Sequence, residues 1–294
     1  MKVAFFFLSP LLLFFSGFAP PSSSTLQVAL DLPTSSYAQR IVQVTEPFLG
    51  APYHLSPLGE GASSTIDQDP RFRADAFDCT TFVETAIALA HARSLAEAHQ
   101  LLDAIRYQSG TVGFLTRRHF PEAEWIPELI KLGLLKDITR AVGGDDVVVE
   151  NKTLSAEIWR KSSHKGLPHL PAERVPQGTF SLDVWRLPSA RMHQKMIPPG
   201  TLLHVVRADF RSVPVRVSHQ GIVIEKNGKR FLRHAADRMY HAVVDEELDH
   251  FFARMEKYRK WPVVGVHLTL LQENTAWRDQ VLSSFDSMIS QPSK

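Results

Sequence analysis

The spacing of hydrophobic residues changes along the chain, from helical in the N-terminal half to alternating in the C-terminal half. Apolar residues three and four positions apart predict helices over 36–49, 79–92 and 95–108, and a last helix within 274–294. Apolar or alternating runs predict strands over 145–150, 201–207 and 263–271, with a short helix over 154–161. Pro47 weakens the first helix, whereas Ser94 and Glu97 form a capping box at the third. Helices that precede an antiparallel set of strands are typical of an α+β fold.

Two stretches rich in Gly and Pro show neither spacing. Residues 50–77 contain Gly, Pro, Ser and Asp throughout, and they are predicted to form a long loop. Loops of this length are more often functional than idle. Residues 162–198 hold seven Pro or Gly residues. We expect them to be irregular, as part of an insertion that spans about 138–198.

The strongest local signal lies between two histidines. His219 and His234 flank two alternating runs that are joined by Asn227-Gly228, the pair that a two-residue type I′ turn prefers. In the resulting register Gly221 opposes His234, and the two histidines become diagonal neighbours on one face. Because Gly221 has no side chain to separate them, we expect the histidines to form a pair. A loop one residue longer or shorter would remove this argument.

The N-terminus has the pattern of an export signal. Met1 and Lys2 precede an apolar run over 3–18, and small residues follow it, which is typical of a secretory signal peptide. The run is shorter than the stretch of about 20 residues that a membrane-spanning helix needs, and Pro10 interrupts it. We expect cleavage after Ala19 or within 22–25. An uncleaved N-terminal anchor is the alternative.

Composition narrows the choice of function. The 33 Lys and Arg residues nearly balance the 31 Asp and Glu residues, for a formal net charge of +2, so no strong field favours a nucleic acid or an anionic membrane. Hydrophobic residues make up 44% and charged residues 22%, which excludes a disordered, collagen-like or coiled-coil chain. The single Cys excludes an internal disulfide and any zinc site with two Cys ligands.

That cysteine, Cys79, lies where a helix is predicted to begin. Asp78 is a good N-cap, which places Cys79 in the first turn. Free N–H groups and the positive end of the helix dipole favour a thiolate there, so we expect a lowered pKa for Cys79. The same N–H groups can bind the oxyanion of a tetrahedral intermediate. On position alone, the alternative is a small buried hydrophobe.

A cysteine activated by a histidine, which a third polar group orients, is the general arrangement of a thiol nucleophile. Cys79, His219 and His234 fit this arrangement in that order. A zinc site made of the two histidines and a carboxylate is the competing chemistry, but it leaves Cys79 without a role. The sequence has no H-E-x-x-H motif and no phosphate-binding Gly loop. We therefore expect neither a metal nor a cofactor.

The order of these motifs resembles the NlpC/P60 superfamily of cell-wall cysteine amidases. The segments that carry the resemblance are G-A-P-Y at 50–53, F-D-C-T-T-F-V at 77–83, H-Q-G-I-V-I at 219–224 and H-A at 234–235. The sequence is most similar to the N-acetylmuramoyl-L-alanine amidase-like branch, formerly a domain of unknown function. Further marks of that branch are matched by R-R-H-F at 117–120, W-I at 125–126 and L-R-H-A at 232–235.

The resemblance implies a papain-like core, in which N-terminal helices carrying the Cys pack on an antiparallel sheet carrying the His residues. By position it makes Cys79 the nucleophile, His219 the general base and His234 the residue that orients His219. Tyr53 would lie near the oxyanion and the substrate carbonyl. The alternative for Tyr53 is an ordinary loop aromatic.

The resemblance also bears on the substrate. Endopeptidase members have D-C-S-G, in which the Ser helps to receive a free L-Ala amine, whereas this chain has D-C-T-T at 78–81. The departure favours the branch that cuts between the muramic acid lactyl group and L-Ala of soluble muropeptides, including anhydro-muropeptides. Arg117, His119 and Trp125 would then contact the sugar and a carboxylate. The alternative is a packed Trp beside two solvated cations.

The sequence thus predicts a cysteine-dependent N-acetylmuramoyl-L-alanine amidase, exported to the periplasm or cell exterior of a bacterium. Its predicted parts are a signal peptide with a short linker (1–24), an amidase domain (25–273) and a C-terminal tail (274–294). The expected partners are peptidoglycan-derived muropeptides, with no nucleic acid and no stable membrane insertion after signal removal. A γ-D-glutamyl-diaminopimelate endopeptidase and a non-catalytic wall-binding relative are the alternatives.

Overall fold

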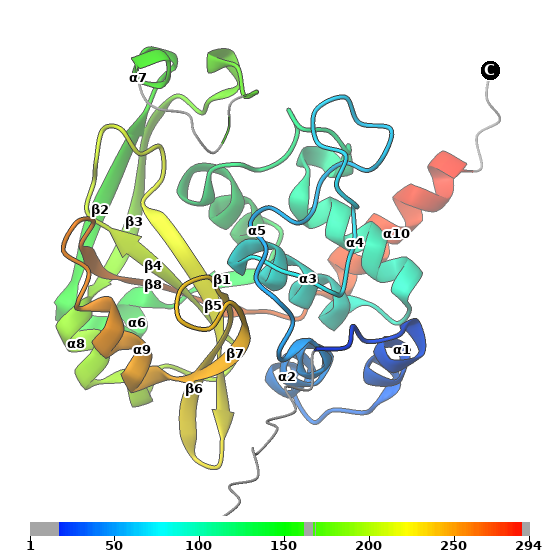
Figure 1. The fold of residues 1–294 in the computed structure, drawn as a ribbon, viewed down its shortest axis with the longest axis horizontal. Helices are drawn as coiled ribbons and strands as arrows, with labels where there is room; N and C mark the ends of the chain where they lie inside the picture. The colour runs from blue at the N-terminus through cyan, green and yellow to red at the C-terminus, as the bar shows by residue number, and fades with distance from the viewer. Residues whose placement is uncertain (1–17, 162–166, 168, 290–294) are drawn as a thin grey trace, which may run out of the picture.

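The computed structural model of the chain describes residues 18–161, 167 and 169–289. Figure 1 shows a group of helices beside a large twisted sheet whose strand pairs are all antiparallel. The predicted α+β class with an antiparallel sheet is therefore confirmed, while the papain-like core stays a prediction. Residues 1–17, which hold most of the predicted signal peptide, lie outside the described residues. Within the described part, none of the helices is long and apolar enough to cross a membrane.

Eight strands of the described chain form one sheet, in the order β2-β3-β8-β4-β5-β6-β7, with β1 paired to β8. Their bounds are β1 Leu135–Asp137, β2 Val147–Leu154, β3 Gly178–Arg186, β4 Thr201–Arg207, β5 Val217–Lys226, β6 Lys229–Ala236, β7 Ala242–Glu247 and β8 Val263–Leu271. Every residue of β4 is buried. Its side chains alternate between two apolar clusters, with Leu202 and Val206 in one and Leu203 and Val205 in the other.

The helices cover both faces of the sheet (Figure 1). Their bounds are α1 Ser23–Asp31, α2 Tyr37–Thr45, α3 Cys79–His91, α4 Leu95–Arg106, α5 Ile126–Lys131, α6 Thr139–Gly143, α7 Ala156–Lys161, α8 Leu187–Met192, α9 Leu248–Met255 and α10 Thr275–Ile289. On one face α3 packs against β5 and β6. On the other, Leu187 of α8 and Phe251 of α9 belong to the same apolar cluster as Val223 of β5.

Most predicted elements are confirmed, and their ends follow local chemistry. The helix predicted over 36–49 divides into α2 and a 3-10 turn, Glu46–Phe48, because Pro47 cannot continue an α-helix. The Ser94 side chain caps α4 as predicted, but Glu97 accepts the N–H of Arg93 instead of completing a capping box with Ser94.

The expectation of an irregular segment over 162–198 is wrong for its second half. Residues 178–186 form β3, which pairs along its length with β2 and also with β8, and α8 follows directly. The signal was present in the alternation of Phe180, Leu182 and Val184, of which Leu182 and Val184 are buried. Gly178 and Pro188 mark the ends of these elements instead of disrupting them.

The predicted hairpin forms with the predicted register. Asn227 and Gly228 both have positive φ, 50° and 74°, as a type I′ turn requires. Val223 pairs with Leu232 and Lys226 with Lys229. The turn therefore fixes which residues of β5 and β6 share a face. Val223 and Leu232 lie on the face that packs against Phe251 of α9, together with His219 and His234. Gln220, on the opposite face, bonds to Thr80 at the start of α3.

Candidate active site

Cys79 is the first residue of α3, and its position depends on Asp78. The Asp78 carboxylate accepts a hydrogen bond from the Thr81 N–H at 2.8 Å, and the Thr81 hydroxyl accepts one from the Asp78 N–H at 3.0 Å. This is a complete capping box, so the predicted N-cap is confirmed. The other Asp78 oxygen accepts the N–H of Ser56 at 2.9 Å. Asp78 thereby fixes the 50–77 loop against the helix start.

The Cys79 thiol is partly exposed in a cavity. Its pKa is raised, whereas the sequence predicted a lowered pKa. Burial by surrounding atoms and the Asp78 carboxylate raise the pKa of Cys79 to about 12, although the Gln220 N–H and the Thr80 hydroxyl favour the thiolate. The predicted lowering was wrong, because the favourable helix N-terminus is outweighed by desolvation and by the negative charge of the capping residue. Cys79 is therefore a neutral thiol at pH 7.

His219 and His234 meet as the hairpin register predicted. Nε2 of His219 lies 2.7 Å from Nδ1 of His234, and the two rings are nearly perpendicular, at 77°. Gly221 makes this possible, because a Cβ there would lie 2.8 Å from the Cβ of His234. Burial lowers the pKa of both histidines, so both rings are neutral at pH 7.

The polar chain continues to two residues that the sequence analysis missed. Nε2 of His234 lies 3.2 Å from Oε2 of Glu246 on β7. Arg254 of α9 donates to both Glu246 oxygens, at 3.1 and 2.6 Å. Burial alone raises the pKa of Glu246, but hydrogen bonds from His234 and Arg254 lower it to about 2. Glu246 lies on an edge strand, β7, that the sequence analysis did not predict. Its position two residues after Val244, on the same face, is the one local signal that could have identified it.

The ionised Glu246 determines where the histidine protons lie. An ionised carboxylate 3.2 Å away favours a proton on Nε2 of His234, which leaves Nδ1 of that ring as an acceptor. Nε2 of His219 then donates to that nitrogen. Nδ1 of a neutral His219 is consequently unprotonated and can accept a proton, and His219 lines the same cavity as Cys79.

A second network supports Cys79 from within the sheet. The Gln220 side chain donates to the Thr80 hydroxyl oxygen at 3.0 Å and accepts from Nδ1 of His204 at 3.0 Å. Nε2 of His204 in turn contacts the hydroxyl of Thr269 at 2.9 Å. Because Gln220 occupies an acceptor site of Thr80, the Thr80 hydroxyl proton is directed elsewhere, and it stabilises the negative form of the Cys79 sulfur.

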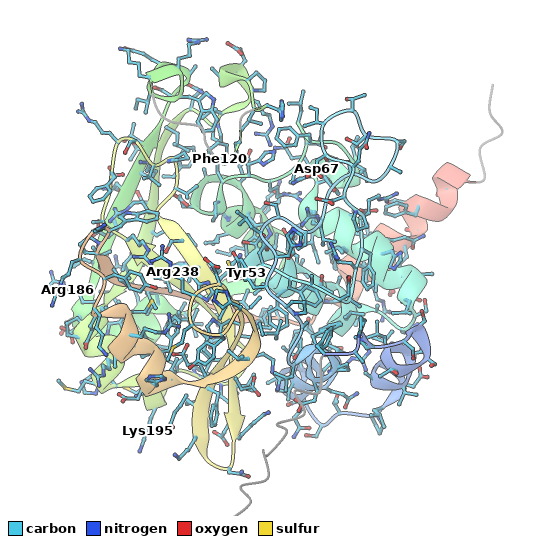
Figure 2. The ribbon with its side chains drawn as sticks, in the orientation of Figure 1. Tyr53, Asp67, Phe120, Arg186, Lys195 and Arg238 are labelled. Carbon is cyan, nitrogen blue, oxygen red and sulfur yellow. The ribbon has the colours of Figure 1, made fainter. Side chains whose placement is uncertain are left out.

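The cavity over Cys79 has a volume of about 340 Å³ and is also lined by Tyr53, His219 and His234. Figure 2 labels Tyr53 near the middle of the view. Burial and the nearby Cys79 and Asp78 raise the pKa of Tyr53, so its hydroxyl remains a donor at pH 7. The Cys79 N–H lies in the first turn of α3, where the helix offers it no carbonyl, and it favours the thiolate of its own side chain. That N–H and the Tyr53 hydroxyl are therefore available for an oxyanion.

Arg117, His119 and Trp125 do not line this cavity. Arg117 pairs with Glu60 and Asp67, and Nε2 of His119 contacts the Phe114 carbonyl at 2.7 Å. Burial lowers the pKa of His119 to about 4.

Trp125 is only 2% exposed. Its indole N–H donates to Glu84 at 3.0 Å, and Glu84 also pairs with the buried Arg106. The three residues hold loops and helices together outside this cavity, and their contact with substrate stays a prediction. Short motifs do not distinguish these roles, because both need polar groups at fixed positions.

Metal chemistry was the competing prediction. Within residues 18–161, 167 and 169–289, no three His, Cys, Asp or Glu side chains are grouped so that they could hold a metal ion. The two histidine nitrogens that face each other are hydrogen-bonded to one another. The cavity brings together a thiol and a hydrogen-bonded pair of histidines.

Comparison with solved structures finds similar folds. A protein from Legionella pneumophila str. Philadelphia 1, assigned to a family of unknown function, is 25% identical over 85% of this chain and 94% of its own, with a TM-score of 0.75. An N-acetylmuramoyl-L-alanine amidase from Bacteroides uniformis ATCC 8492 is 20% identical over 81% and 99%, with a TM-score of 0.63. A putative xylanase from Bacteroides fragilis is 21% identical over 76% and 97%, with a TM-score of 0.57.

Comparison with curated proteins finds no match. A family model does match, and it is described as AmiA-like, N-acetylmuramoyl-L-alanine amidase-like. The match extends over residues 43–257, which include Cys79, His219, His234 and Glu246. The chain therefore belongs to the AmiA-like, N-acetylmuramoyl-L-alanine amidase-like family.

Proposed function

We propose that the protein is a cysteine amidase that hydrolyses the N-acetylmuramoyl-L-alanine bond of peptidoglycan fragments, including anhydro-muropeptides. The observation that carries the proposal is the presence of Cys79, His219 and His234 at one cavity, with the buried Glu246 behind His234. Family membership supports the amide substrate. We also propose that the α3-on-sheet arrangement is the papain-like core of the NlpC/P60 superfamily.

Catalysis begins from a neutral thiol and a neutral imidazole. Nδ1 of His219 takes the Cys79 proton as the sulfur attacks the lactyl carbonyl carbon, which gives a tetrahedral oxyanion and an imidazolium. His234 and Glu246 stabilise that imidazolium through two successive hydrogen bonds. A preformed thiolate–imidazolium pair is not needed, since the raised pKa of Cys79 and the lowered pKa of His219 both favour the neutral pair.

The intermediate collapses in two stages. The Cys79 N–H and the Tyr53 hydroxyl hold the oxyanion. His219 then protonates the departing L-Ala nitrogen, the C–N bond breaks, and a thioester joins Cys79 to the lactyl acyl group. Water, deprotonated by the same His219 nitrogen, attacks the thioester. The products are the free muramic acid carboxylate, the intact peptide and the restored thiol.

Thr80 supports this bond over the endopeptidase bond. In the endopeptidase branch the residue after the Cys helps to receive a free peptide amine. Here the Thr80 hydroxyl is bonded to Gln220 and directed at the Cys79 sulfur. A group engaged in this way is poorly placed to accept an ammonium, which agrees with a substrate whose L-Ala nitrogen is part of an amide.

A cell-wall substrate fits export to the periplasm or cell exterior of a bacterium, which we propose from the N-terminal sequence. A signal peptide would be removed before residue 26, and no nucleic acid or membrane partner is needed. The segment from Ser23 onward forms α1, whose Leu26 and Leu30 are buried. Cleavage after Ala19 would therefore leave α1 intact, with its N-cap Ser22.

The test is mass spectrometry of products from a defined disaccharide-tetrapeptide. Free disaccharide and intact tetrapeptide from wild type, but not from Cys79→Ala or His219→Ala, support the proposal. The matched control is His193→Ala, which removes an exposed histidine outside the cavity. A disaccharide-dipeptide product would move the cut to the endopeptidase bond and overturn the proposal. Loss of activity to a chelator with resistance to iodoacetamide would replace it with metal hydrolysis.

A further inference from the structure

Part of the cavity wall next to the catalytic residues is cationic. Arg207, Arg238, Arg254 and Lys260 all line it, and Asp237 is the one acidic residue among the described residues that line it. Figure 2 labels Arg238 and Tyr53, and both residues line the cavity. None of the proposed catalytic steps needs a positive charge from Arg238 or Lys260, so their presence calls for a separate role.

Two of the four cations are already engaged by the protein. Arg254 is paired with Glu246. The Arg207 guanidinium lies over the rings of Tyr258 and Trp261, with its carbon 4.4 and 5.0 Å from the ring centres. Its Nε donates to the Ser218 hydroxyl at 2.6 Å.

Arg238 and Lys260 differ from these two. Both side chains are exposed. Among the described residues, no carboxylate oxygen lies within 4.0 Å of the Arg238 guanidinium or the Lys260 ammonium, so neither cation forms an ion pair. They come from different segments, Arg238 from the turn after β6 and Lys260 from the connection between α9 and β8. Two unpaired cations from separate segments at one cavity form a site for an anion.

We propose that Arg238 and Lys260 bind the carboxylates of the peptide that leaves during hydrolysis. The inference rests on the proposed function, and it follows from where the charges of such a substrate lie. The lactyl carboxyl is consumed in the scissile amide, and the N-acetylated sugar carries no charge. Every free carboxylate of the fragment is therefore on the peptide side, beginning with the peptide's own C-terminus.

This assignment sets the direction of the substrate in the cavity. The peptide runs from the Cys79 sulfur toward Arg238 and Lys260, and the glycan occupies the remaining side. Before cleavage the two cations contribute mainly to binding, because the carboxylates do not change charge during the reaction. They are expected to affect KM and to leave kcat unchanged.

The experiment compares two substrates that differ only in peptide charge. One is a muramoyl tripeptide with free carboxylates, and the other is the same compound with each carboxylate converted to a carboxamide. The full chain is tested as wild type, Arg238→Gln, Lys260→Gln and the double variant. Arg259→Gln is the matched control, because Arg259 is an exposed cation next to Lys260 that does not line the cavity.

Each single variant is expected to raise KM for the free-acid substrate about fivefold, and the double variant about 25-fold, as for partly solvated ion pairs. The carboxamide substrate and the Arg259→Gln control should show KM values within a factor of two of wild type. Asp237→Asn should lower KM for the free acid, since it removes the one competing negative charge of the lining. Equal effects on both substrates, or no effect of the double variant, would overturn the assignment.

Binding separates this inference from the proposed function. Calorimetry with the Cys79→Ala chain measures Kd for both compounds without hydrolysis. If wild type cleaves neither compound, the proposed reaction fails, while a preference for the free acid that the Arg238→Gln and Lys260→Gln changes abolish still supports the anion site. If wild type cleaves both compounds and the Kd values show no such preference, the anion site fails and the reaction stands.

Discussion

Glu246→Gln tests the polar chain behind Cys79 most directly. The amide has nearly the shape of the carboxylate, so the variant removes charge without creating a cavity. Its oxygen can still accept from Nε2 of His234, but it no longer stabilises a positive charge on the histidine pair. Its NH₂ group can also donate to that nitrogen. That arrangement reverses the protons of both rings and leaves Nδ1 of His219 protonated and unable to act as the base.

The pKa of Glu246 sets the order of magnitude of the effect, because coupling between the carboxylate and a charged histidine is reciprocal. Burial by itself raises the pKa of Glu246, but hydrogen bonds from His234 and Arg254 outweigh burial and lower this pKa from 4.5 to about 2. At 1.36 kcal/mol for each pH unit this corresponds to about 3 kcal/mol. Because Arg254 is partly exposed to solvent, screening reduces the value to about 2 kcal/mol. A loss of 2–3 kcal/mol from the transition state lowers kcat by roughly 30- to 150-fold.

The assay is kcat for muropeptide hydrolysis, read beside thermal denaturation. The matched control is Glu247→Gln, which changes the next residue of β7, where the side chain is exposed and pairs with Lys229. A kcat for Glu246→Gln within threefold of wild type would refute the idea that the charge supports catalysis. The depressed pKa also predicts a stability contribution that is complete above pH 4.5 and lost as the pH falls toward 2. In Glu246→Gln this acid dependence should become weaker.

Three further predictions test other parts of the site. The rate of Cys79 alkylation by iodoacetamide should rise about tenfold for each pH unit between pH 6 and 9, because the pKa near 12 leaves a neutral thiol; a plateau below pH 7 would indicate a preformed ion pair. Gly221→Ala should lower kcat and cost about 1–3 kcal/mol of stability, since its Cβ would lie 2.8 Å from His234, whereas Gly113→Ala, with no contact under 3.4 Å, should change neither. Trp125→Phe should cost about 1–3 kcal/mol of unfolding free energy through the lost bond to Glu84; a raised KM with unchanged stability would restore the predicted sugar contact.

The sequence by itself determined the elements whose chemistry is local. Asp78 caps the helix that begins at Cys79 because capping needs only neighbouring residues. Asn227-Gly228 selected one turn, and the turn set the register that brings His219 to His234. Fold class followed from hydrophobic spacing in the same way. These features depend on interactions between residues close in the chain, which a single sequence contains.

Only the tertiary structure decided what depends on distant segments. Burial and charge reversed the expected pKa of Cys79, because desolvation is the sum over everything that packs around the thiol. Glu246 joined the histidines through pairing of β6 with β7. The hydrogen bond from Trp125 to Glu84 holds the indole in the core, away from the cavity. Arg238 and Lys260 became one anion site because the fold places both segments at one cavity, and no spacing in the sequence encodes a distance of that kind.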